Sequence, residues 1–182
     1  EFGDKSDYLK TLTTLCLDSI RQLSFETDHI TYLAVLEGPH VMYCDKVDPT
    51  GDSAPRAFRM RLDAHSCALG KAMLAYKSFE ELKEIYKSYS LYKHTFNTIT
   101  TLDKLYSELR KIRQIGYSLN EAETFDYVYG VGTAILDSQG RAIAAISLSG
   151  TKGTINVKTI PDLAKKVIKT ASQISSKLSE DN

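Results

Sequence analysis

Residues 64–75 read Ala-His-Ser-Cys-Ala-Leu-Gly-Lys-Ala-Met-Leu-Ala and carry the strongest chemical signal in the chain. A polar turn ending at Cys67 leads into a predicted helix that opens with the mostly small residues Ala68, Leu69 and Gly70. Small side chains let a ligand approach the backbone N–H groups at the positive end of a helix. The segment therefore predicts either a carboxylate-binding site or a helix that packs closely on a sheet.

Two serines near the C-terminal end form a second candidate site. Ser147 and Ser149 are two residues apart on a predicted strand, so both hydroxyls point to the same face. The residues around them are apolar, and binding pockets are mostly apolar with few polar groups, so the pair fits an enclosed site as well as a solvated strand. Two hydroxyls beside free backbone N–H groups bind a carboxylate without a buried cation.

Cys67 follows His65 by two residues, which raises the question of nucleophilic catalysis. A catalytic cysteine needs a lowered thiol pKa, an oxyanion site and a group that orients its base. The sequence shows no orienting third group, and it contains no glycine-rich phosphate loop. We therefore predict that the chain is not an enzyme.

Asp63, His65 and Cys67 alternate along the chain and have side chains that bind metal ions. Their spacing matches no standard zinc pattern. A structural hydrogen bond is the preferred interpretation for His65, and we predict no metal and no cofactor.

Amphipathic helices are predicted at both ends of the chain. Apolar residues at helical spacing indicate one helix from Asp7 to about Thr27 and another that starts at about Thr159. Each apolar stripe covers the core or, in part, meets a partner. The stripes consist of Leu9, Leu12, Cys16, Ile20 and Leu23 in the first helix and Leu163, Val167, Ala171, Ile174 and Leu178 in the second.

Two shorter helices are predicted in the middle of the chain. Ser78 and Glu81 form a capping box for one of them. The other opens at Thr100 and ends at Gly116.

Two hairpins are predicted between the terminal helices. Residues 30–36 and 41–47 are rich in β-branched and aromatic side chains and form the first, and residues 128–136 and 141–148 form the second. Alternation over residues 58–63 predicts a further, half-buried strand.

The predicted elements define the fold class. Hairpins and a single strand, bracketed by helices and without βαβ alternation, indicate an α+β domain with an antiparallel sheet flanked by helices. This arrangement is similar to that of GAF and PAS sensor domains, so we expect a GAF-like sheet. Arginines 56, 59 and 61 give the single strand a basic edge, which is either solvated or guides an acidic ligand.

Length and charge limit the functions available to the chain. Its 182 residues suit one domain with a real core. Lys plus Arg equals Asp plus Glu at 23 each, which argues against direct binding to DNA phosphates. No apolar run is long enough to span a membrane. Three cysteines, Cys16, Cys44 and Cys67, are an odd number and predict free thiols in the cytoplasm.

The pattern His-x-x-Ala-Leu-Gly-Lys-Ala-x-Leu-Ala at residues 65–75 resembles the signature of the IclR family of bacterial transcription regulators. Further matches follow in the family's order: residues 113–117, Glu121 and Glu123, residues 137–141, and residues 144–150. The resemblance covers about Tyr8 to Leu178 and only the C-terminal effector-binding domain, without a winged helix-turn-helix. We expect residues 7–182 to be this domain. Residues 1–6 should be a disordered start, because Glu1-Phe2 looks like a restriction-site remnant in front of a truncated chain.

The resemblance implies a pocket on one side of the sheet that binds an effector, which in this family is mostly a small organic acid. The second hairpin would form its floor, and the loop and helix after the third strand its roof. The effector contacts that the resemblance implies are Leu62, Cys67, Ala68, Leu69, Gly70, Asn120, Tyr129, Gly130, Ser147 and Ser149.

Two of these positions depart from the family pattern. Asn120 stands where an acidic residue is common, and Gly130 stands where cysteine or another small residue is frequent. Tyr117, Tyr127 and Tyr129 lie nearby in the sequence and indicate a pocket of altered shape. An aromatic acid is therefore one candidate ligand, although strand aromatics more often serve packing.

The resemblance predicts a ligand-sensing and oligomerisation domain, a homodimer or homotetramer, that controls DNA binding allosterically. DNA would be contacted only through the missing N-terminal winged helix-turn-helix, and no membrane would be involved. The alternative is a GAF-like small-molecule sensor module of another signalling system.

Overall fold

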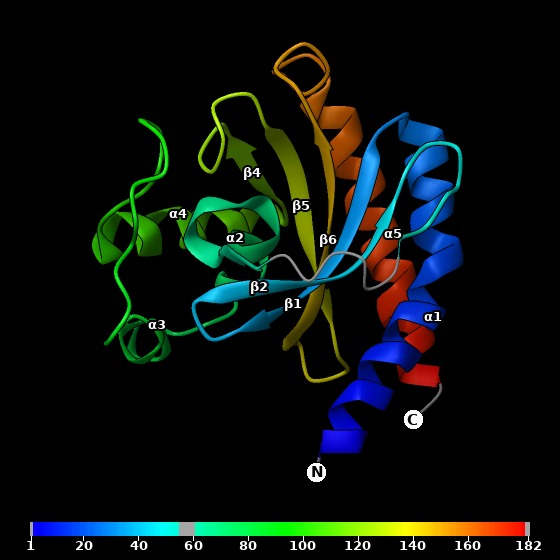
Figure 1. The fold of residues 1–182 in the computed structure, drawn as a ribbon, viewed down its shortest axis with the longest axis horizontal. Coiled ribbons are helices and arrows are strands. Elements are labelled where there is room, and N and C mark those ends of the chain that lie inside the picture. Colours follow the sequence, from blue (N-terminus) through cyan, green and yellow to red (C-terminus); the bar gives the residue numbers. More distant parts are fainter. Residues whose placement is uncertain (1, 55–60, 181–182) are drawn as a thin grey trace.

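The computed structural model describes residues 2–54 and 61–180, which form a curved antiparallel sheet with helices on both faces (Figure 1). The strands lie in the order β3-β2-β1-β6-β5-β4. They are β1 (Ile30–Glu37), β2 (His40–Val47), β3 (Arg61–Asp63), β4 (Ser118–Glu121), β5 (Tyr129–Leu136) and β6 (Ala142–Gly150). The helices are α1 (Phe2–Thr27), the 3-10 turn η1 (Ala64–Ser66), α2 (Ala68–Leu74), α3 (Phe79–Ile85), α4 (Leu102–Ile115) and α5 (Ile160–Glu180).

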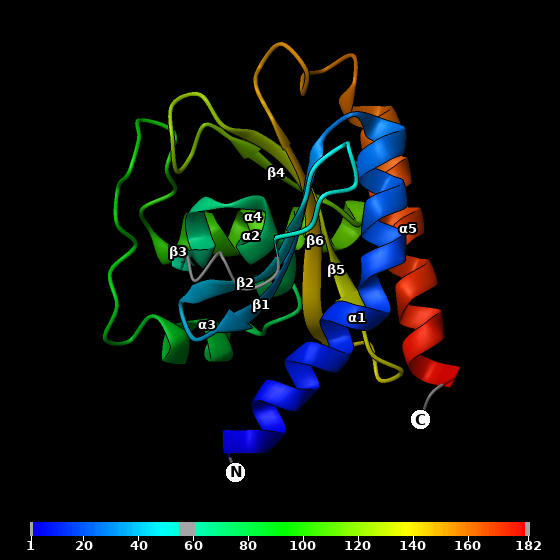
Figure 2. The same ribbon diagram turned by 45° about the vertical axis from the view of Figure 1, so that its right-hand side comes forward.

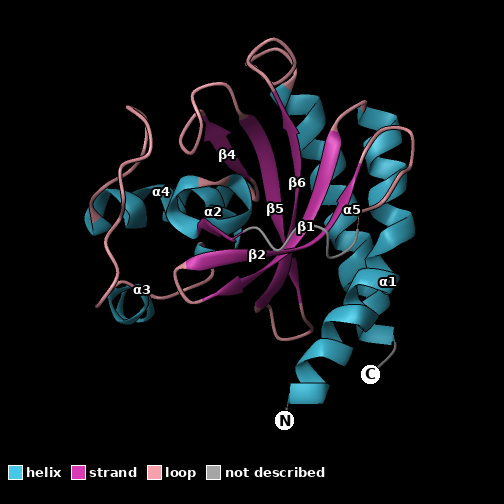
Figure 3. Cartoon of the chain, viewed as in Figure 1, coloured by secondary structure: helices cyan, strands magenta, loops and turns pink. Residues whose placement is uncertain are grey.

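The sheet separates two hydrophobic cores. Helices α1 and α5 lie side by side on one face, whereas α2 covers the other face, with α4 packed against α2 and α3 against α4 (Figures 1 and 2). Figure 3 shows the same arrangement, with the helices on either side of the strands. The predicted α+β class with an antiparallel sheet is confirmed.

Both terminal helices bury their apolar stripes in the core between α1, α5 and the sheet. Leu12, Cys16, Ile20 and Leu23 of α1 are buried there, together with the inward residues of α5. The stripes therefore cover the core and do not supply a free surface for a partner. Helix α1 begins at Phe2, ahead of the predicted Asp7.

The hairpins agree closely with the sequence-based prediction, but one strand was missed. The strand β4 pairs with β5 at the edge of the sheet, for example Asn120 opposite Gly130. Its sequence, Ser-Leu-Asn-Glu, lacks the β-branched and aromatic residues that mark strands, so only pairing with a neighbour reveals it. Of the predicted basic edge, Arg56 and Arg59 lie outside the described residues, and Arg61 pairs with Glu37.

Close packing of α2 on η1 requires a glycine. A Cβ atom built on Gly70 would lie 2.1 Å from the carbonyl oxygen of Ala64. Gly132 lets β5 approach α2 in a similar way, since its Cβ would lie 3.1 Å from the backbone of Ala68. The start of α2 is thereby pressed against both η1 and the sheet.

Candidate functional site

A cavity of about 100 Å³ lies between the sheet, the start of α2 and the segment 124–128. Eight of the ten residues that the sequence analysis selected line it: Leu62, Cys67, Ala68, Leu69, Asn120, Gly130, Ser147 and Ser149. The other lining residues are Tyr32, Tyr43, Thr124, Phe125, Val128 and Leu148. No member of this set carries a charged side chain.

Three unpaired polar groups come together at the cavity. Ser147 and Ser149 face it from β6, and Asn120 from β4. Within the described part of the chain, neither serine hydroxyl has a hydrogen-bond partner. Asn120 Oδ1 accepts the N–H of Glu123 at 2.9 Å, which orients the amide and leaves its NH₂ group free to donate. The cavity therefore offers neutral hydrogen-bond donors to a ligand.

The start of α2 contributes fewer free backbone donors than the sequence suggested. Cys67 is the N-cap residue, and its Sγ accepts the N–H of Gly70 at 3.4 Å. The N–H of Lys71 bonds to the carbonyl of Cys67 at 3.0 Å. The N–H groups of Ala68 and Leu69 are the ones left at this helix end. Because α2 is only seven residues long, its dipole adds little, and the side-chain donors matter more.

Gly70 and Tyr129 do not line the cavity. Gly70 serves the contact with Ala64 described above. Tyr129 precedes Gly130 on β5, and since neighbouring strand residues face opposite sides, its ring packs in the core beside α1 and α5.

The aromatic residues of the cavity are also different from those predicted. Tyr117 packs in the core on the opposite face, and Tyr127 is exposed. Tyr32 and Tyr43 line the cavity instead, with their rings edge to face at 5.1 Å. The sequence places Tyr32 and Tyr43 on predicted strands, but the face of the sheet that each side chain occupies depends on how the two hairpins pair.

A buried ion pair holds one wall of the cavity. Lys71 on α2 is 1% exposed, and its Nζ lies 2.8 Å from Glu123 Oε1 and 3.7 Å from Glu108 Oε1. Burial raises the pKa of Glu123, and the Lys71 charge opposes that rise. Glu123 is followed by Thr124, whose hydroxyl donates to the carbonyl of Ser66 at 2.7 Å. Lys71 and Glu123 each belong to a motif that the sequence shows, but their ion pair was not predicted, because the two residues are 52 positions apart.

Cys67 is not arranged as a nucleophile. Burial raises the pKa of its thiol to about 12, so the thiol is protonated at neutral pH. His65 Nε2 pairs with the carbonyl oxygen of Tyr92 at 2.9 Å, as expected for a structural hydrogen bond, and no hydrogen bond joins His65 to Cys67 among the described residues. Cys67 is also absent from the one group of potential metal ligands found there, which contains Asp63, His65 and His94.

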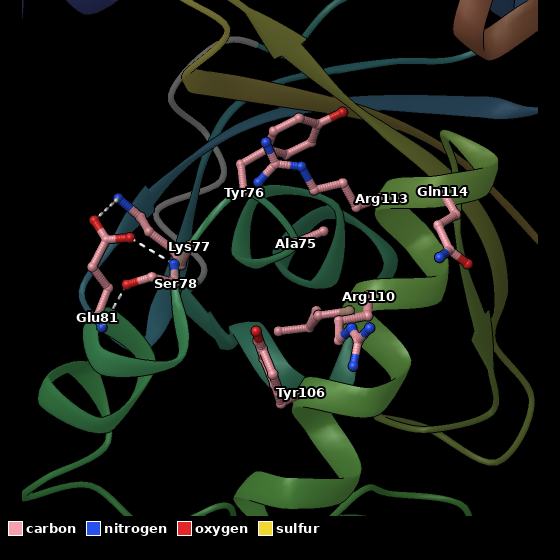
Figure 4. Close-up of a pocket in the computed structure, with 10 residues that line it drawn as sticks. Ala75, Tyr76, Lys77, Ser78, Glu81, Tyr106, Arg110, Arg113 and Gln114 are labelled. Carbon is pink, nitrogen blue, oxygen red and sulfur yellow. Dashed lines mark hydrogen bonds and ion pairs between the residues drawn. The ribbon is translucent and has the colours of Figure 1, made fainter.

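A second hollow, of about 440 Å³, lies where the end of α2, the start of α3 and α4 meet (Figure 4). It opens to solvent, because Glu81, Arg110 and other lining residues are exposed. The guanidinium of Arg113 lies over the ring of Tyr76 at 5.0 Å. None of the predicted effector contacts lines this hollow, whereas eight of them line the smaller cavity, which is therefore the candidate site. Among the described residues, no helix is long and apolar enough to cross a membrane.

A mostly apolar cavity with a few polar groups, carried by an antiparallel sheet, fits a site that binds a small molecule. The chain matches the family model described as bacterial transcriptional regulator IclR C-terminal over residues 10–176. It belongs to this family, and it spans the effector-binding domain of these transcription regulators, which are not enzymes. The alternative of a sensor module from another signalling system is therefore wrong.

Individual proteins agree with this assignment. The HTH-type transcriptional regulator XynR of Escherichia coli is 31% identical over 133 residues, which are 71% of this chain and 52% of XynR. The chain thus spans about half the length of that relative. The crystal structure of Thermotoga maritima IclR superposes with a TM-score of 0.85 at 30% identity, over 97% of this chain and 73% of that one.

A ligand complex also shares the fold. The inducer-binding domain of PobR from Acinetobacter, a double mutant bound to 3-hydroxybenzoic acid, has a TM-score of 0.79 at 23% identity. The match covers 89% of this chain and 96% of that one. At this identity the likeness shows the fold alone.

Proposed function

We propose that the cavity beneath α2 binds a small organic acid and that this binding controls DNA binding by a helix-turn-helix segment outside this sequence. The observation that carries the proposal is the set of unpaired donors, Ser147, Ser149 and Asn120, around a cavity whose described lining residues carry no charge. Hydrogen bonds from neutral donors to a carboxylate are strong when water is excluded. Because none of the described lining residues is a lysine or arginine, these residues carry no cost of burying an unpaired cation when no ligand is bound.

The size and lining of the cavity narrow the class of acid. A volume of about 100 Å³ limits the ligand to a small acid. Tyr32, Tyr43 and Phe125 offer aromatic surfaces, which favour an aromatic acid over an aliphatic acid of similar size. The complex of the PobR domain with 3-hydroxybenzoic acid supports this choice by analogy. A thermal-shift screen with 3-hydroxybenzoate, benzoate and short aliphatic acids tests it, since a ligand of the folded state raises the melting temperature.

The double variant Ser147→Ala/Ser149→Ala is expected to bind the acid found in that screen more weakly, by roughly 1–3 kcal/mol for each lost hydrogen bond. Isothermal titration calorimetry measures the loss. Ser172→Ala/Ser176→Ala is the matched control, because these serines are exposed on α5, which packs on the face of the sheet opposite the cavity. Equal affinity in the cavity variant and the control would place the site elsewhere.

Control of DNA binding would follow from linkage. An acid that binds one arrangement of the domain more tightly shifts the population toward it, and DNA must change the affinity for the acid by the same factor. The HTH-type regulator XynR is longer than the part of it that this chain matches, which is 52% of its length. This supports a DNA-binding segment elsewhere in the full protein.

We expect the chain to form a homodimer or homotetramer in solution, as the family resemblance implies. The buried stripes of α1 and α5 do not supply the contact, so it must use other surfaces, such as those around exposed Phe96 and Tyr92. Light scattering at high protein concentration measures the mass. A monomer mass would contradict the expectation without affecting the proposed ligand site.

A further inference from the structure

A cluster of metal-binding side chains lies outside the cavity, where the end of β3 meets the long loop between α3 and α4, the green segment at the left of Figure 1. Asp63, His65 and His94 each place one oxygen or nitrogen within 4.8 Å of the others. Asp63 and His65 belong to β3 and η1, whereas His94 follows Asp63 by 31 residues. The fold of the loop brings His94 to the other two.

The Asp63 carboxylate is the centre of this cluster. His94 Nε2 lies 2.7 Å from Asp63 Oδ2, and His40 Nε2 lies 3.5 Å from Asp63 Oδ1. The Tyr89 hydroxyl donates to Oδ1 at 2.9 Å. A buried carboxylate is thus flanked by imidazoles and oriented by a phenol, which resembles the outer hydrogen bonding of ligating carboxylates in metal sites.

His65 provides the second, independent observation. Its side chain is fully buried, and its Nε2–H donates to the carbonyl of Tyr92 at 2.9 Å. The neutral ring therefore carries its lone pair on Nδ1, which is buried and has no hydrogen-bond partner. Leaving a buried acceptor unpaired is costly. Metal-ligating histidines typically donate their other N–H to a backbone carbonyl or a carboxylate, as His65 does here.

We propose that Asp63, His65 and His94 bind a divalent transition-metal ion of the zinc class, with His65 ligating through Nδ1. Two imidazoles and a carboxylate are a known three-ligand set for zinc, with the fourth position open to water or to His40. Neighbouring ligand atoms in a tetrahedral zinc site lie about 3.3 Å apart. The ligand atoms of the cluster lie within 4.8 Å of one another, so the widest pair must approach by at most about 1.5 Å. His94 lies outside any helix or strand, which allows this adjustment.

Such an ion would fix the loop of residues 86–101 against η1. The same loop is hydrogen-bonded to the segment that precedes Thr124. The hydroxyls of Thr95 and Thr98 donate to the carbonyls of Ala122 and Glu123, respectively, each at 2.7 Å. Thr124, the next residue, lines the cavity. Metal binding is therefore expected to stabilise one wall of the proposed effector site, although the metal site does not depend on that proposal.

Titration of the chelator-treated chain with Co²⁺ and Zn²⁺ tests the site directly. We expect one equivalent of Co²⁺ to give visible d–d bands without the near-ultraviolet band of a cobalt–thiolate bond. Zn²⁺ should displace Co²⁺ and raise the melting temperature. Absence of binding at micromolar concentrations, or a thiolate band, would overturn the proposal without any variant.

Variants then assign the ligands. His94→Ala and Asp63→Asn should each weaken Zn²⁺ binding by about 100-fold or more, because loss of an outer-shell partner alone costs about 10- to 100-fold. His29→Gln is the control, since it removes a histidine outside the cluster. Melting curves recorded with chelator verify that the variants fold. Wild-type affinity in both His94→Ala and Asp63→Asn would refute the assignment.

Discussion

Replacing Lys71 by methionine is expected to destabilise the domain by about 3–5 kcal/mol, the usual effect of removing one partner of a buried ion pair. Lys71 is almost completely buried, and its Nζ contacts Glu123 at 2.8 Å and Glu108 at 3.7 Å. Methionine fills similar space, so the loss comes mainly from the charge of Glu123, which stays buried without a cation. Urea unfolding at pH 8 measures the change in the free energy of unfolding.

The pH dependence separates this cause from a simple packing defect. In the wild type, burial already raises the pKa of Glu123 and Lys71 opposes the rise, so Lys71→Met must raise the pKa further. When the pKa of a carboxyl is higher in the folded state than in the unfolded state, the folded protein becomes more stable as the pH falls through the folded-state pKa. The destabilisation by Lys71→Met should therefore be smaller at pH 5 than at pH 8.

Two further variants complete this experiment. Lys71→Met/Glu123→Leu should recover much of the loss, because the buried carboxylate is then removed and the remaining partner, Glu108, is 34% exposed. Lys77→Met is the matched control: Lys77 pairs with the exposed Glu81 at 3.9 Å, and an exposed pair contributes about 0–1 kcal/mol. If Lys71→Met and Lys77→Met were equally mild, the buried pair would not be what holds this wall of the cavity.

Gly70→Ala is expected to destabilise the domain by about 3 kcal/mol or more, at the upper end of the range for overpacked sites. The added Cβ would lie 2.1 Å from the carbonyl oxygen of Ala64, and because that oxygen belongs to the backbone it cannot rotate away as a side chain would. Thermal melting measures the effect. Gly153→Ala is the control, because its nearest contact would be 3.6 Å and Gly153 is exposed.

This variant also decides what Gly70 does. The sequence analysis placed Gly70 among the effector contacts, whereas the structure places it at the contact between η1 and α2. A stable Gly70→Ala protein that had lost only acid binding would restore the original prediction. A loss of stability in the absence of any acid would assign the residue to packing.

Most of the helices and strands, and part of the candidate site, could be predicted from the sequence. The periodicity of α1 and α5, the capping box at Ser78 and Glu81, and the left-handed Gly116 after α4 were all readable, because each depends on residues close together in the chain. The common face of Ser147 and Ser149 also follows from the two-residue period of a strand. Such features depend only on the spacing of residues that are close together in the chain.

Only the tertiary structure decided which distant residues meet. Tyr32 and Tyr43 reach the cavity, whereas Tyr129 faces the other core, because the pairing of the hairpins sets the faces of β1, β2 and β5. His94 joins Asp63 and His65, and Glu123 joins Lys71, through loops whose paths carry no periodic signal. These contacts depend on the register of the sheet and on burial, and neither is encoded in the spacing of neighbouring residues.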